Sequence, residues 1–273
     1  MPSFGGVHSS LIGTRWRRRR TAVSPSGDFA AHQSWKETVT QPANAYALAS
    51  LGAIFLFLLV IAGAVLVYAS DITFRGTTLY LKLLSEGGVV EELTAILLGV
   101  AALIALRAFF KVPETLRWSR PFLVLFALFA ILMGLEEISW GQRVLQIETG
   151  EFFQKYSSQK EINVHNVVAP YLRRHGYAVR TTSQIAAIVL FTYGVILPTL
   201  SAFRGPRALF RKFRLIIPPP ALMVGFFFGS LLAWFDWPTG EDEELGEFLF
   251  SLCFVLLVPL WRLQQRYEAY AAP

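Results

Sequence analysis

The stretch that decides the fold runs from Pro121 to Gln142 and reads PFLVLFALFAILMGLEEISWGQ. Fifteen residues from Pro121 to Leu135 rise about 22 Å as a helix, whereas the hydrocarbon core of a bilayer is about 30 Å thick. Glu136 and Glu137 therefore lie at or just below a predicted membrane boundary. A charge at that depth costs roughly 2.5 to 3.5 kcal/mol, so such carboxylates usually face a bundle interior, a watery cavity or a partner.

The composition around this stretch is that of a membrane protein. Of the 273 residues, 54% are hydrophobic and 16% are charged, and the apolar residues come in continuous blocks. The net charge of +6 does not indicate a nucleic-acid partner, because the basic residues lie between the apolar blocks instead of forming one stripe. The single cysteine excludes a disulfide within one chain and a thiolate metal cluster.

Six apolar blocks have nearly the length of a membrane span, so we predict an all-α, polytopic bundle of about six transmembrane helices. The continuous blocks lack the alternation of a membrane β-barrel. Pro198 predicts a kink in the fourth block. The sequence GFFFG, residues 225–229, predicts close approach of another helix to the fifth. The blocks are placed at about 46–69, 89–110, 121–140, 184–203, 215–235 and 245–261.

The charges predict the orientation of this domain, residues 46–273. Residues 1–45 are polar and basic, and we predict a disordered cytoplasmic arm. With that arm inside, the cytoplasmic segments hold 17 of the 25 Lys and Arg residues but 4 of the 19 Asp and Glu residues. The basic count predicts that both termini are cytoplasmic. The acidic residues therefore gather at the opposite, outer side.

Carboxylates mark the outer ends of several blocks. Glu86 and Glu91 stand at the start of the second block, and Glu247 precedes fourteen apolar residues that rise about 21 Å. The helix macrodipole alone explains acids at helix starts, including Glu243 and Glu244, although Glu244 and Glu247 share a helix face. That explanation fails for residues 136–137 at a helix end. Because adjacent helical residues point about 100° apart, only one of these two can face the interior.

A long outer segment, residues 141–183, follows the third block. It exceeds the length of a simple connector, and Val164, Val167 and Val168 keep helical spacing, so we predict a lid that lies on the membrane. Within it, His165 lies between Asn163 and Asn166. One histidine with nearby carboxylates can bind a divalent cation or act as an acid/base pair. A loop histidine is, however, more often a hydrogen-bonded structural group, and no HExxH or HxxxH motif accompanies this one.

Three motifs stand out between residues 86 and 166: EGGVVEELT, GLEEISWGQR and INVHN. Together they resemble a recurring signature of uncharacterised bacterial multi-pass membrane proteins. The resemblance implies a bacterial inner (plasma) membrane location and implies which residues matter, but no activity. The matching positions are Glu86, Gly88, Glu91 and Thr94, then Gly134, Glu136, Glu137, Ser139, Trp140, Gly141 and Gln142, then Asn163, His165 and Asn166.

We therefore predict an outward-facing polar site covered by the 141–183 loop. Catalytic roles are predicted for Glu136, Glu137 and His165, and Glu136 and His165 are also the candidate ligands of a divalent cation. The predicted substrate-binding residues are Glu86, Glu91, Gln142, Asn163, Asn166 and Glu247.

Three functions remain open at this point. The first is a metal-assisted enzyme that acts on a lipid-linked or amphiphilic substrate. The second is a transporter or cation-binding module, and the third is a non-catalytic membrane subunit. The inner halves of the blocks are nearly uniformly apolar, which favours a one-sided site over a transport path. The expected partners are membrane lipids, and the oligomeric state is left open.

Overall fold

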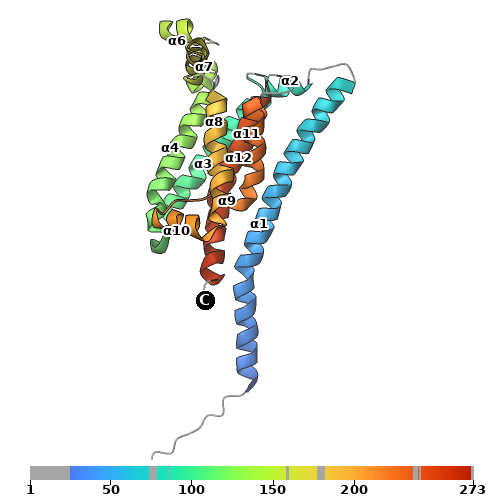
Figure 1. Ribbon diagram of the computed structural model, residues 1–273, viewed down its shortest axis with the longest axis vertical. Helices are drawn as coiled ribbons and strands as arrows, with labels where there is room; N and C mark the ends of the chain where they lie inside the picture. Colours follow the sequence, from blue (N-terminus) through green and yellow to red (C-terminus); the bar gives the residue numbers. More distant parts are fainter. Residues whose placement is uncertain are drawn as a thin grey trace, which may run out of the picture. The chain divides into compact units, whose positions relative to one another are not determined.

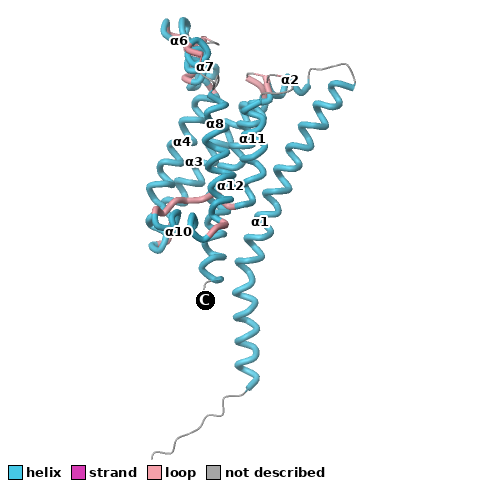
Figure 2. Tube along the Cα trace, in the orientation of Figure 1, coloured by secondary structure: helices cyan, strands magenta, loops and turns pink. Residues whose placement is uncertain are grey.

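The computed structural model of the chain describes residues 25–73, 79–85, 87–157, 160–176, 182–235, 239 and 241–271. All regular structure in these ranges is helical (Figure 2), which confirms the all-α prediction. By contacts the chain divides into residues 1–40 and residues 41–273. In the first unit, residues 25–40 are helical and belong to α1 (Pro25–Thr73). Residues 25–45 of the predicted disordered arm are thus helical, and residues 1–24 lie outside the described part.

Five helices are long and apolar enough to cross a membrane, and the chain is therefore an integral membrane protein. The fifth predicted block, 215–235, forms a shorter apolar helix, Pro220–Phe235. The prediction of about six spans thus corresponds to five full-length helices and one short one. The five are Pro42–Ser70, Leu79–Lys111, Glu114–Glu137, Thr182–Ser201 and Asp242–Ala271.

The elements follow one another with short connections. After α1 come α2 (Leu79–Leu84), α3 (Val89–Lys111), η1 (Glu114–Ser119) and α4 (Arg120–Glu137). The turn η2 (Ser139–Gly141) leads into the predicted lid, which holds α5 (Gln142–Leu145), α6 (Glu151–Tyr156) and α7 (His165–Arg174). The remaining elements are α8 (Thr182–Phe191), the π-helix η3 (Thr192–Ile196), α9 (Leu197–Ser201), α10 (Arg204–Lys212), η4 (Pro220–Leu222), α11 (Met223–Phe235) and α12 (Asp242–Ala271).

Helix α12 is the centre of the bundle and packs on α3 and α11, while α4 packs on α3 and α8 packs on α11 (Figure 1). Its buried face is almost entirely apolar, from Leu249 to Trp261. The core also takes in Phe57 of α1 and Leu123 of α4, both fully buried. Residues from widely separated segments therefore share one core, which fixes the relative positions of the helix ends.

Glycines let α11 and α12 approach closely. A Cβ atom added at Gly246 of α12 would lie 2.7 Å from the carbonyl oxygen of Gly229, and one at Gly229 would lie 2.8 Å from the Phe250 ring. One at Gly225 would lie 2.5 Å from the Cys253 sulfur. The close helix approach predicted from GFFFG is confirmed, because no side chain larger than hydrogen fits at these positions.

A π-helical turn separates α8 from α9. The turn η3 contains Gly194, where an added Cβ would lie 2.0 Å from the Phe226 ring of α11. Pro198 follows two residues after the turn and lacks the N–H that an α-helix would direct at the Gly194 carbonyl. The irregularity that the proline predicts is therefore a widened turn beside a tight helix contact.

Candidate functional site: a carboxylate cluster at one end of the bundle

Three carboxylates from two helices meet where α4 ends and α12 begins. Glu137 is the last residue of α4, and Glu244 and Glu247 lie in the first two turns of α12. One oxygen of each lies within 4.8 Å of an oxygen of the other two. We call these three residues the carboxylate cluster, and the end of the bundle that holds them the acidic end.

The local sequence explains how the cluster forms. Glu244 and Glu247 are three residues apart and so project from one face of α12. Glu137 is only 9% exposed, whereas its neighbour Glu136 is partly exposed and points elsewhere. The close approach at Gly246 holds the start of α12 in place. The predicted divergence of the two adjacent glutamates is thus confirmed.

Two further side chains surround the cluster. Glu91, in the first turn of α3, is 8% exposed, accepts a hydrogen bond from the backbone N–H of Gly87, and interacts electrostatically with all three cluster carboxylates. The Ser183 hydroxyl of α8 donates a hydrogen bond to Glu247 Oε1 at 3.2 Å. Glu137 and Glu247 lie within hydrogen-bonding reach of each other. Four helices therefore contribute to one polar site.

The charge of this site requires compensation. Carboxylates at this separation repel one another strongly when they are withdrawn from water. Hydrogen bonds such as those from the Ser183 hydroxyl and the Gly87 N–H do not neutralise carboxylates that are ionised. The cluster is therefore stable only with protons or a cation among its oxygens.

Glu136 holds the predicted lid instead of joining the cluster. Its Oε1 accepts a hydrogen bond from Trp140 Nε1 at 2.6 Å. Its Oε2 accepts from the backbone N–H groups of Val164 at 2.8 Å and His165 at 3.3 Å, where α7 starts. A carboxylate at the N-terminus of a helix satisfies free N–H groups and complements the helix dipole. This geometry gives Glu136 a clear structural role.

A strained turn leads from α4 into the lid. Ser139, Trp140 and Gly141 all have positive φ, at 48°, 56° and 76°. For the two residues that are not glycine this conformation costs about 1 to 3 kcal/mol each. Ser139 is fully buried, and its hydroxyl donates a hydrogen bond to Glu161 of the loop. The Trp140 indole N–H donates to Glu136. These two bonds hold the turn.

The amide side chains of the motifs connect the lid to this turn. Gln142 Oε1 accepts from the backbone N–H of Ile162 at 2.7 Å, and its Nε2 donates to the Thr149 hydroxyl. Asn163 Nδ2 donates to the Glu136 carbonyl oxygen at 2.9 Å, and Asn166 is buried. Asn163 therefore joins the loop to the end of α4, and Gln142 joins two parts of the loop. The contact with a substrate predicted for Gln142, Asn163 and Asn166 remains a prediction.

His165 lies beside the cluster but outside it. Desolvation of the imidazole lowers its pKa from the ordinary value, although Glu136, Glu91 and Glu161 act in the opposite direction. Among the described residues, the group that can hold one metal ion consists of the three cluster glutamates and does not include His165 or Glu136. The roles predicted for this histidine in catalysis and metal binding remain predictions.

The structure thus brings together part of the predicted site. Glu91, Glu137 and Glu247 meet as expected, Glu136 and His165 belong to the adjacent lid network, and Glu86 lies outside the described residues. Glu244 was not among the predicted site residues. Its spacing from Glu247 was the signal that could have identified it.

Comparison of the chain with protein-family models, curated proteins and solved structures finds no match. The geometry of the site is therefore the basis on which a function is inferred. The resemblance of the three motifs to uncharacterised bacterial membrane proteins stays a prediction.

Proposed function

We propose that this integral membrane protein binds a divalent cation in the carboxylate cluster. The observation that carries the proposal is that one oxygen from each of Glu137, Glu244 and Glu247 lies within 4.8 Å of the others. Carboxylate oxygens are preferred ligands of hard cations such as Mg²⁺, Ca²⁺ and Mn²⁺. A cation would also neutralise the charge that two helices bring together at this point.

We place the acidic end on the extracytoplasmic side of a bacterial inner membrane, with both termini in the cytoplasm. Supporting this orientation, α10 carries Arg204, Arg207, Arg211 and Lys212 and lies toward the opposite end of the bundle (Figure 1). Arg211 pairs there with Glu268 near the end of α12, at 3.7 Å. The excess of basic residues at that end matches the rule for cytoplasmic loops.

The surroundings of the cluster favour a one-sided site over a transport path. Below Glu247, the buried face of α12 is apolar apart from Ser251, whose hydroxyl is bonded to the Phe248 carbonyl at 2.7 Å. A path for ions would need polar groups through the full depth of the bundle. The favoured function is therefore a cation-dependent enzyme or binding protein for an amphiphilic substrate at the outer boundary.

The lid supplies the group best suited to accept a proton in such an enzyme. Because the pKa of His165 is lowered, its imidazole is neutral near pH 7. A bound cation would supply Lewis-acid chemistry or an activated water. His165 interacts electrostatically with Glu91, which borders the cluster, so a substrate at the cluster would lie near this base.

Metal analysis of the purified protein tests the proposal. The wild type should retain about one divalent cation per chain, and its unfolding free energy should rise by about 2.7 kcal/mol at a cation concentration one hundred times the dissociation constant. Glu137→Gln and Glu247→Gln should lose both effects. Glu92→Gln is the matched control, because Glu92 lies in the same turn as Glu91 but is exposed. Absence of bound cation in the wild type, or equal content in all variants, would overturn the proposal.

A further inference from the structure

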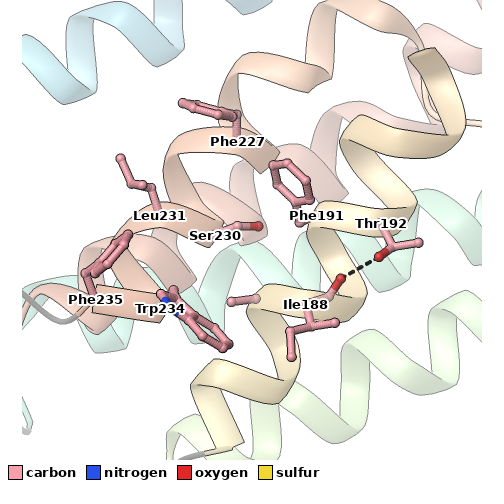
Figure 3. A pocket seen from close by; sticks show the side chains of 9 residues that line it. Ile188, Phe191, Thr192, Phe227, Ser230, Leu231, Trp234 and Phe235 are labelled. Atoms are coloured by element: carbon pink, nitrogen blue, oxygen red, sulfur yellow. Dashed lines mark hydrogen bonds between the residues drawn. The ribbon is translucent and has the colours of Figure 1, made fainter. Parts of the chain in front are cut away.

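A groove on the side of the bundle lies close to the carboxylate cluster. It is formed by α8, η3 and α11, has a volume of about 280 Å³, and is open on one side. Its walls are mostly apolar and aromatic, as Figure 3 shows: Ile188, Phe191, Phe227, Leu231, Trp234 and Phe235. Both helices belong to the apolar segments of the membrane domain, so the groove faces hydrocarbon.

One polar atom in this groove has no partner. Ser230 is 6% exposed, and its hydroxyl has no hydrogen-bond partner among the described residues. Its side chain lies on the face of α11 that is turned toward α8 (Figure 3). Hydroxyls in membrane helices usually bond to a carbonyl of the preceding turn, as Thr192 does with the Ile188 carbonyl at 2.8 Å. Leaving a buried hydroxyl unpaired destabilises the fold, and lipid offers no water to satisfy it.

The groove begins about one helical turn from the carboxylate cluster. Ser183, which donates to Glu247, precedes the groove residue Ala187 by four residues of α8, a rise of about 6 Å. Gln184 Nε2 donates to the Trp234 carbonyl oxygen at 3.2 Å and joins the two walls at this end. A molecule with its polar end at the cluster can therefore extend its chain along the groove.

We propose that the groove binds an acyl chain of an ester-linked membrane lipid, whose ester carbonyl accepts a hydrogen bond from Ser230 and whose headgroup reaches the carboxylate cluster. The apolar walls fit the chain, and the unpaired hydroxyl fits an acceptor at its head. An isoprenyl phosphate has the same apolar character, but its acceptor oxygens are all on the phosphate, which would lie at the cluster. The hydroxyl inside the groove therefore fits the ester carbonyl of an acyl lipid. The headgroup part depends on the proposed cation site, because a cation would be needed to hold a phosphate beside carboxylates. The lipid would then be the substrate or ligand.

Photolabelling of the intact protein in phosphatidylcholine nanodiscs tests this proposal. The probe is a phosphatidylglycerol that carries a diazirine in one acyl chain, and the adducts are mapped by mass spectrometry. We expect adducts concentrated at residues 187–192 and 227–235, in excess of other lipid-facing surfaces such as Leu125 of α4, which is 66% exposed. Ile188→Trp, which fills the groove, should remove this excess. Val189→Trp is the matched control, because Val189 is adjacent and exposed but does not line the groove.

Further variants separate the parts of the proposal. Ser230→Ala should lower the excess labelling by an ester-linked probe and leave labelling by its ether-linked analogue unchanged. The groove proposal is overturned if labelling in the groove is no stronger than at Leu125, or if the two tryptophan variants are labelled equally. It is also overturned if an isoprenyl phosphate displaces the probe equally well, or if two protein copies crosslink through the groove. If cation binding fails in the wild type while groove labelling persists, the proposed function is wrong and the chain site stands. If cation binding persists without the excess labelling, the groove proposal is wrong and the proposed cation site stands.

Discussion

Replacing Gly246 by alanine tests whether the approach of α11 and α12 positions the carboxylate cluster. The added Cβ would lie 2.7 Å from the Gly229 carbonyl oxygen and 3.0 Å from the Ala233 backbone nitrogen. Ordinary packing places such contacts at 3.4 Å or more, so the two helices must separate locally by about 0.7 Å. Both neighbours are backbone atoms, which cannot turn away as a side chain could. Overpacking of this kind costs about 1 to 3 kcal/mol.

The same displacement should affect the cluster. Gly246 lies between Glu244 and Glu247, whose oxygens must stay close to that of Glu137. Metal–ligand distances tolerate deviations of about 0.2 Å, which is less than the expected separation. We therefore expect Gly246→Ala to weaken cation binding as well as to lower the unfolding free energy.

The assay is chemical unfolding in mixed detergent micelles, together with a cation titration of each variant. Gly99→Ala is the matched control, because an added Cβ at Gly99 of α3 would meet nothing within 4 Å. That variant should bind cation normally and be as stable as the wild type or up to about 1 kcal/mol more stable, since alanine favours a helix. The reasoning is refuted if Gly246→Ala unfolds at the same denaturant concentration as Gly99→Ala.

Two predictions concern the lid. Glu136→Gln should speed hydrogen exchange at the Val164 and His165 amides by roughly 10- to 100-fold, because a charge-assisted acceptor worth about 1.5 to 3 kcal/mol is lost. Glu148→Gln, at an exposed position of the same loop, should leave exchange at these amides unchanged. Equal exchange rates in the two variants would contradict the capping role of Glu136. NMR titration of His165 should give a midpoint below 6.5, and one that falls further in Glu136→Gln, because that carboxylate favours the protonated ring. Since His165 binds a proton less readily in the folded protein than in the unfolded chain, the stability of the lid should fall as the pH drops below 6.5. A His165 midpoint above 6.5 would contradict this pH dependence.

The sequence predicted the helices well because their lengths follow from continuous apolar blocks. It also predicted that Glu136 and Glu137 diverge, since adjacent helical residues point in different directions. It did not predict Glu244 as a member of the site, because the dipole at a helix start explains an acid there without any partner. Which acids meet depends on the relative positions of α4 and α12, and these follow from the packing of both helices on α3.

The conformation of the turn before the lid could not be predicted from the sequence for a different reason. The left-handed conformation of Ser139 and Trp140 is unfavourable for these residue types, so no local preference could indicate it. The bond of Ser139 to Glu161, 22 residues away, and the local bond of Trp140 to Glu136 explain it. The π-helical turn was equally hidden, because Pro198 predicts an irregularity but not its form.

The π-helical turn determines how α8 is rotated about the axis of the fourth span relative to α9. Each residue of a helix advances about 100° around the axis, so a widened turn holds one residue more than the regular repeat would. Winding Thr192–Ile196 as a regular α-helix, with no residue removed, would rotate α8 by about that angle relative to α9. Ser183 would then swing away from Glu247, and the groove would lose one wall. The wider winding of this one turn thereby keeps the polar site next to the apolar groove.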